Sequence, residues 1–221
     1  RAKLLPLLAI PLLGLVGMGV SGIWDRIQIK REASAVHAMT ELAIHASGLV
    51  HELQRERAYS TGFLNGDGKA FSEELRTQRE ATDGAKRALT AYLAGGSVDP
   101  SDSGVGVLRN QATEYLSRLD RMRQRISSRE VAAADEIAYF TETNAVFLDL
   151  VGQMASVGDQ AEIGRAVVAY VALLRSKECA GIERAVVANA LGQGSFAPGA
   201  YVKFISAVNS QSVLTQQFLS L

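Results

Sequence analysis

Apolar residues recur at every third or fourth position along most of this chain, the spacing that places them on one face of an α-helix. One such pattern runs from Ala33 to Leu64 and ends at the turn sequence NGDG, residues 65–68. Similar patterns follow at residues 71–93, 108–126, 137–154, 159–191 and 201–218. No segment shows the sustained alternation of a β-strand, so the pattern predicts an all-α protein.

Six amphipathic helices joined by short turns are typical of antiparallel helical bundles. The first and fifth predicted helices are much longer than an average helix. We therefore expect two stacked bundles that share these long helices.

The N-terminal segment differs from the rest, because no charged residue occurs from Leu4 to Trp24. At about 1.5 Å per residue, a helix of this length spans the roughly 30 Å hydrocarbon layer of a membrane. Trp24 stands where an interfacial side chain belongs, and Arg1 and Lys3 favour a cytoplasmic N-terminus. A cleaved signal peptide is the alternative. We expect a transmembrane anchor at residues 1–24 and a helical domain outside the membrane at residues 25–221.

Composition excludes several classes of function. Lys and Arg balance Asp and Glu at 23 each, and zero net charge argues against a nucleic-acid partner. A single cysteine, Cys179, rules out a Cys-based zinc site, and the three histidines have no helical metal-ligand spacing. No nucleophile or carboxylate has an evident catalytic partner. We expect no metal, no cofactor and no enzyme activity in this chain.

Two distant segments each place an arginine after a glutamate within a predicted helix. Residues 51–68 contain Glu56-Arg57-Ala58, residues 175–194 contain Glu183-Arg184-Ala185, and both run on to a glycine-rich turn and a phenylalanine. We interpret the two segments as a weak internal repeat.

Small neighbouring residues would let another helix approach each arginine and bury it. A buried guanidinium needs a partner. One candidate is a carboxylate across the bundle, namely Glu56, Glu178 or Glu183. The other is a small anion that Arg57 and Arg184 share through bidentate hydrogen bonds.

The same segments carry a family resemblance. LVHELQRERAYSTGFL is followed by FSEELRTQREATD, and AYVALLRSKECAGIERAVVANAL is followed by FAPGAYVKF. In sequence, order and separation these blocks resemble the nitrate- and nitrite-sensing family, over residues 34–221. The family often has Glu-Arg-Gly where this chain has Glu56-Arg57-Ala58. The resemblance implies two stacked four-helix bundles in which Arg57 and Arg184 bind nitrate or nitrite, and Ser60 and Lys177 are candidates for further ligand contacts.

The family occurs in transmembrane chemoreceptors, sensor histidine kinases, cyclase-type receptors and some cytosolic antiterminators. With the N-terminal anchor, the resemblance favours a methyl-accepting chemotaxis protein in the inner membrane of a bacterium, with a periplasmic or extracellular sensor domain. The chain begins without Met, and we expect it to be a fragment of a longer receptor. A histidine kinase of a two-component system, a cyclase-type receptor, or a dimerisation module without a ligand are the alternatives. We also expect a homodimer, since Gly17 and Ser21 form a small-xxx-small face.

Overall fold

The computed structural model describes residues 4–95, 103–153 and 161–221, and these ranges are helical apart from short turns. The prediction of an all-α protein is confirmed. The described ranges contain α1 (Leu4–Asn65), α2 (Ser72–Ala94), α3 (Ser103–Ser117), α4 (Leu119–Ser127), α5 (Ala133–Gln153), α6 (Ala161–Gln193) and α7 (Ala200–Ser220).

The segment predicted as one helix at residues 108–126 is interrupted at Arg118, which separates α3 from α4. The turn after α1 forms as predicted, with Asp67 and Gly68 in left-handed conformations at φ of 55° and 76°. A left-handed residue cannot continue a right-handed helix, so the chain reverses there.

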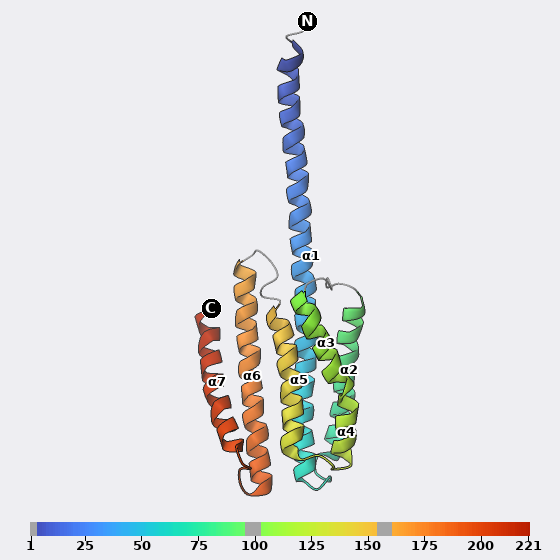
Figure 1. Cartoon of the computed structure of the whole chain (residues 1–221), viewed down its shortest axis with the longest axis vertical. Coiled ribbons are helices and arrows are strands. Elements are labelled where there is room, and N and C mark those ends of the chain that lie inside the picture. Colours follow the sequence, from blue (N-terminus) through green and yellow to red (C-terminus); the bar gives the residue numbers. More distant parts are fainter. Residues whose placement is uncertain (1–3, 96–102, 154–160) are drawn as a thin grey trace.

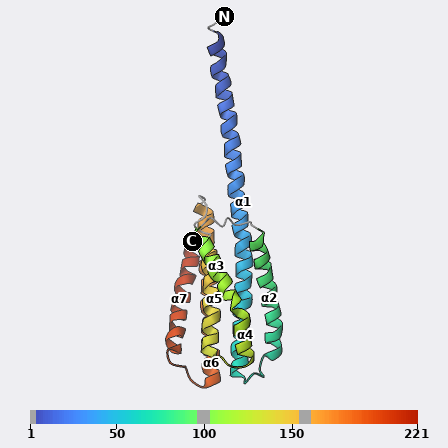
Figure 2. The same ribbon diagram turned by 45° about the vertical axis from the view of Figure 1, so that its right-hand side comes forward.

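The second half of α1 lies beside α2, α5 and α6, while α7 lies at the edge of the molecule against α6 (Figures 1 and 2). The helices of the bundle lie side by side along one stretch of α1 (Figure 1). Helix α1 contacts α2, α5 and α6. The finer expectation, two stacked four-helix bundles that share the long helices, stays a prediction.

The hydrophobic core lies between α1, α2, α3, α4 and α5. Leu42, Ala46, Leu49 and Leu53 of α1 are at most 1% exposed and follow the three-four spacing of one helix face. By contrast, Ala207 is the one residue of α7 that is classed as buried. The α7 edge is therefore held by fewer buried apolar side chains than the core around α1.

The prediction of a transmembrane anchor at residues 1–24 gains no support. Among the residues that the structure describes, no helix is long and apolar enough to cross a membrane. The side chains of residues 4–17 lie outside the described ones. Helix α1 passes residue 24 without a break and continues into the bundle (Figure 1). The uncharged run is thus one end of a single long helix, and the division at residue 24 stays a prediction.

Candidate functional site

Two neighbouring residues of α1, Glu56 and Arg57, are both almost fully buried, with exposures of 0% and 1%. They point to different helices. Glu56 accepts two hydrogen bonds from Arg123 of α4, at 2.8 Å from Nε and 2.9 Å from Nη2. Burial opposes the charge on Arg123, but the hydrogen bonds and charges of Glu56 and Asp83 together outweigh it and raise the pKa of Arg123. Glu56 therefore joins α1 to α4.

Arg57 points instead toward α5 and α6. Its Nη1 donates to Oε1 of Glu178 at 2.5 Å, and its Nη2 donates to Oε2 at 3.4 Å. Nη1 also donates to Oγ1 of Thr141 on α5 at 2.8 Å. The Arg57 guanidinium thus holds a planar carboxylate with both terminal nitrogens, in the geometry that arginine uses for oxyanions.

The Glu178 carboxylate receives further donors from neutral side chains. Gln54 Nε2 of α1 lies 2.7 Å from Oε2, and Asn144 Nδ2 of α5 lies 3.2 Å from the same oxygen. All of these groups are buried, and Glu178 is 6% exposed. We call Gln54, Arg57, Thr141, Asn144 and Glu178 the Arg57 cluster.

A glycine on α6 leaves room for the guanidinium. A Cβ added to Gly181 would stand 2.6 Å from Arg57 Nη2. Any larger residue at position 181 would therefore displace the end of the Arg57 side chain. Close approach of α6 to α1 at this point is what brings Glu178 within reach of Arg57.

A second buried carboxylate lies near Arg57. Glu136 of α5 is fully buried, and Thr61 Oγ1 is 2.8 Å from its Oε2. Burial raises the pKa of Glu136 well above its usual value, against the hydrogen bond to Thr61 and the charge of Arg57. This environment favours the protonated form of the carboxyl group.

The second predicted arginine has a different environment. Arg184 is exposed on α6 and forms no salt bridge or hydrogen bond within the described ranges. Its position is three residues beyond Gly181, about one helical turn from the place where Arg57 meets α6. The internal repeat thus places one arginine in the interior and the other at the surface.

The two further candidates also separate. Ser60 is fully buried on α1, and its hydroxyl has no hydrogen-bond partner in the part that the structure describes. Lys177 is exposed, and its Nζ lies 3.0 Å from Nδ1 of His51. Partial burial lowers the pKa of Lys177, against the charges of Glu178 and Glu52, and the charge of Arg184 adds a smaller lowering. Lys177 and Arg184 are thus both exposed cations of α6.

Sequence reasoning named Glu178 as a possible partner but missed Gln54, Thr141 and Asn144. The available signal was their spacing. Gln54 precedes Arg57 by three residues on α1, and Thr141 and Asn144 are three apart on α5, so each pair lies on one helix face. The spacing alone did not show that the two faces meet.

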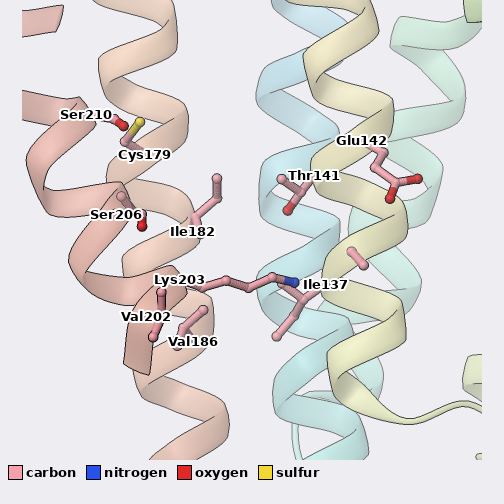
Figure 3. A pocket seen from close by; sticks show the side chains of 12 residues that line it. Ile137, Thr141, Glu142, Cys179, Ile182, Val186, Val202, Lys203, Ser206 and Ser210 are labelled. Atoms are coloured by element: carbon pink, nitrogen blue, oxygen red, sulfur yellow. The ribbon is translucent and has the colours of Figure 1, made fainter. Parts of the chain in front are cut away.

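A cavity of about 430 Å³ lies between α5, α6 and α7 (Figure 3). Its lining includes Thr141, whose hydroxyl also accepts the hydrogen bond from Arg57. It also includes Cys179 and Ile182 of α6, which directly follow Glu178 and Gly181 in the sequence. Lys203 of α7 extends across the cavity toward Ile137 (Figure 3). The cavity therefore reaches the edge of the Arg57 cluster.

Comparison with known proteins gives three agreeing findings. A family model described as nitrate and nitrite sensing matches residues 48–221. A nitrate regulatory protein of Klebsiella oxytoca is 29% identical over 184 residues, which are 81% of this chain and 45% of that protein. The solved structure of the NasR transcription antiterminator matches with a TM-score of 0.82 and 26% identity, over 90% of this chain and 55% of that one. The chain spans about half the length of these two relatives.

These findings correct three predictions. The two relatives are named as a nitrate regulatory protein and a transcription antiterminator, so the prediction of a transmembrane chemotaxis receptor is wrong. The predicted location in the inner membrane, with a periplasmic sensor domain, is contradicted on the same grounds. The exclusion of nucleic acid rested on the charge of this chain alone, and a relative that acts in transcription does not support that exclusion for a whole regulator. The receptor prediction relied on the uncharged N-terminal run. The hydropathy of one segment does not show which kind of signalling output a protein has, and for this reason the prediction failed.

Proposed function

Because the chain belongs to the nitrate- and nitrite-sensing family, we propose that it is the region of a regulatory protein that binds nitrate or nitrite. In this proposal the chain has no enzyme activity of its own, and it passes the binding signal to an output region elsewhere in the protein. The observation that carries the proposal is the Arg57 cluster, in which a buried guanidinium already holds a planar oxyanion, the Glu178 carboxylate.

The shape and charge of the ligand support this choice of site. Nitrate and nitrite are planar monovalent anions, and two oxygens of either can accept parallel hydrogen bonds from one guanidinium. A lysine offers only a compact point charge at the same position. Arg57 is also surrounded by neutral donors, which supply hydrogen bonds without adding charge.

We assign Arg184 the second contact. Arg184 has no ion partner in the described part of the chain, and its position is one turn along α6 from Gly181, which Arg57 contacts. Its long side chain can fold back along α6 toward an anion held by Arg57. Lys177, on the same surface, adds positive potential that attracts anions from solution.

Small size limits the affinity of such a ligand. At a ceiling of about 1.5 kcal/mol per non-hydrogen atom, nitrate gains about 6 kcal/mol. That free energy corresponds to a dissociation constant of some tens of micromolar. We therefore expect a dissociation constant in the micromolar range or higher.

Calorimetric titration of this chain with nitrate and with nitrite tests the proposal. Arg57→Lys and Arg184→Lys should each weaken binding by about tenfold or more, because a hydrogen bond to a charged group contributes about 1.5–3 kcal/mol. Arg76→Lys is the matched control. Arg76 is exposed and pairs only with Glu73 and Glu80 within the described ranges, so its replacement should leave affinity unchanged.

The alternative is a helical module in which Arg57 serves only structure, and the Arg57–Glu178 pair favours it. Thermal melts of the same variants separate the two functions. Unchanged affinity for both anions in Arg57→Lys and Arg184→Lys would exclude an arginine-based anion site. A large fall in melting temperature for Arg57→Lys, with no anion binding by the wild type, would establish the structural module.

A further inference from the structure

One carboxylate of this protein is held by converging donors, as an anionic ligand would be. Glu178 of α6 receives hydrogen bonds from Arg57 and Gln54 of α1 and from Asn144 of α5. Four donor nitrogens from two other helices thus converge on one buried group, and Asn144 and Gln54 both reach Oε2. Such convergence is what a binding site for a planar oxyanion requires.

We propose that Glu178 is an internal ligand, whose carboxylate nitrate or nitrite must displace in order to bind. This inference rests on the proposed function. After displacement, the anion takes the donors that Glu178 leaves, so Gln54 and Asn144 join Arg57 as its ligands. Neither amide is assigned a role by the sequence pattern or by the family match.

Thr141 completes the set of donors. Its hydroxyl oxygen accepts from Arg57 Nη1, and it donates to no group in the described part of the chain. The hydroxyl proton is therefore free to reach an anion beside the guanidinium. Thr141 also lines the cavity between α5, α6 and α7, which gives the anion a path to the cluster (Figure 3).

Charge balance explains why the anion and the carboxylate exclude each other. With Glu178 in place, the charge of Arg57 is already neutralised, and a second anion at the same donors would face a like charge at short range. In the proposed displacement, a change of rotamer turns the Glu178 carboxylate out of the Arg57 cluster toward the α6 surface, where its neighbour Lys177 is exposed. In water the displaced carboxylate regains its hydration.

Displacement also removes a connection between helices. The carboxylate of Glu178 joins α6 to α1 and α5 through the Arg57 cluster. A free nitrate ion holds the same donors of α1 and α5 without a covalent attachment to α6. Ligand binding in this way changes how firmly α6, and α7 packed on it, is held against α1 and α5.

The test compares nitrate affinity in three variants of the chain with the wild type by calorimetric titration. Glu178→Gln keeps the shape of the side chain and removes the competing charge, so it should bind nitrate at least tenfold more tightly than the wild type. Glu178→Asp shortens the side chain, weakens its hold on Arg57 and should also tighten nitrate binding. Asp83→Asn removes a carboxylate from the Arg123 ion pair and should leave nitrate affinity unchanged.

Each outcome decides between the two proposals. Suppose that the wild type binds nitrate and that a folded Glu178→Gln protein binds it equally or more weakly. This result would overturn the internal-ligand inference and leave the proposed anion-sensing function standing. If Glu178→Gln does not fold, Glu178→Asp takes its place with the same criterion. Absence of nitrate and nitrite binding in the wild type and in every folded Glu178 variant would overturn both. If Asp83→Asn increases nitrate affinity as much as Glu178→Gln does, the gain comes from the change in net charge, and the inference is also overturned.

Discussion

At the scale of single residues, burial of charge is the feature that distinguishes this bundle. Glu56, Arg57 and Glu136 are all at most 1% exposed. Glu56 and Arg57 have oppositely charged partners within hydrogen-bond distance, which offsets the large cost of removing a charge from water. Glu136 has only a threonine hydroxyl within that distance, and one of its oxygens, Oε1, has no partner in the described part. Its burial is therefore the least compensated of the three.

We expect Glu136→Gln to stabilise the protein at neutral pH. Burial raises the pKa of Glu136, so its contribution to stability is fully present below its unfolded pKa, near 4.5, and is lost as pH rises through the folded value. Glutamine keeps the shape and the bond to Thr61 without the charge. Its melting temperature should exceed that of the wild type at pH 8 by about 2–4 °C, the shift expected for 1 kcal/mol in a domain of this size.

Thermal melts at pH 4 and pH 8 check this result. The advantage of the glutamine variant should shrink at pH 4, where the wild-type carboxyl is protonated. Equal melting temperatures of the two proteins at pH 8 would show that Glu136 causes no pH-dependent loss of stability.

At the scale of helices, the contact of α1 with α6 depends on Gly181. We expect Gly181→Ala to push the Arg57 guanidinium away from Glu178, because the new methyl group would stand 2.6 Å from Nη2. Overpacking of this kind costs about 1–3 kcal/mol. The variant should melt at a lower temperature. It should also lose about tenfold or more in nitrate affinity, because, unlike a change at Glu178, it displaces the Arg57 guanidinium that the anion itself needs.

Gly48→Ala is the matched control for this change. Gly48 lies on the exposed side of α1, and an added Cβ meets nothing within 4 Å. Alanine at a free helical position should raise stability by about 1 kcal/mol and leave nitrate affinity unchanged. A Gly181→Ala protein that matched Gly48→Ala in melting temperature and affinity would show that Arg57 is not confined by α6.

At the scale of the whole molecule, α7 leaves apolar side chains in water. Val202, Ile205 and Val213 are 67%, 38% and 64% exposed, and their spacing puts them on one side of the helix. We expect this face to pair with α7 of a second copy in a homodimer, since exposed apolar patches of this kind favour association.

Sedimentation of the chain should therefore show a dimer that dissociates on dilution. Val202→Lys together with Val213→Lys should weaken the association by at least tenfold, because it places charges within an apolar contact. Phe71→Lys, which changes an exposed side chain far from α7 in sequence, should have no effect. A wild-type protein that stays monomeric at high concentration would contradict the dimer.

What the sequence determined by itself is the local structure and the family. Helix periodicity depends on residues three and four apart, so the all-α class and the turn at residues 65–68 could be predicted without tertiary contacts. The sequence blocks around Arg57 and Arg184 were long enough to indicate the nitrate- and nitrite-sensing family, which residues 48–221 match. The uncharged N-terminal run led to a receptor type that the relatives do not support.

Only the tertiary structure decided which groups meet. Glu178 lies 121 residues beyond Arg57 in sequence, and their contact exists because α6 packs against α1 at a glycine. Two similar Glu-Arg-Ala segments gave one buried arginine and one exposed arginine, since α1 is enclosed by helices on several sides and α6 lies nearer the edge. Sequence spacing fixes the helix face on which a side chain stands, whereas its partner depends on the neighbouring helix, which is set by packing across the whole chain.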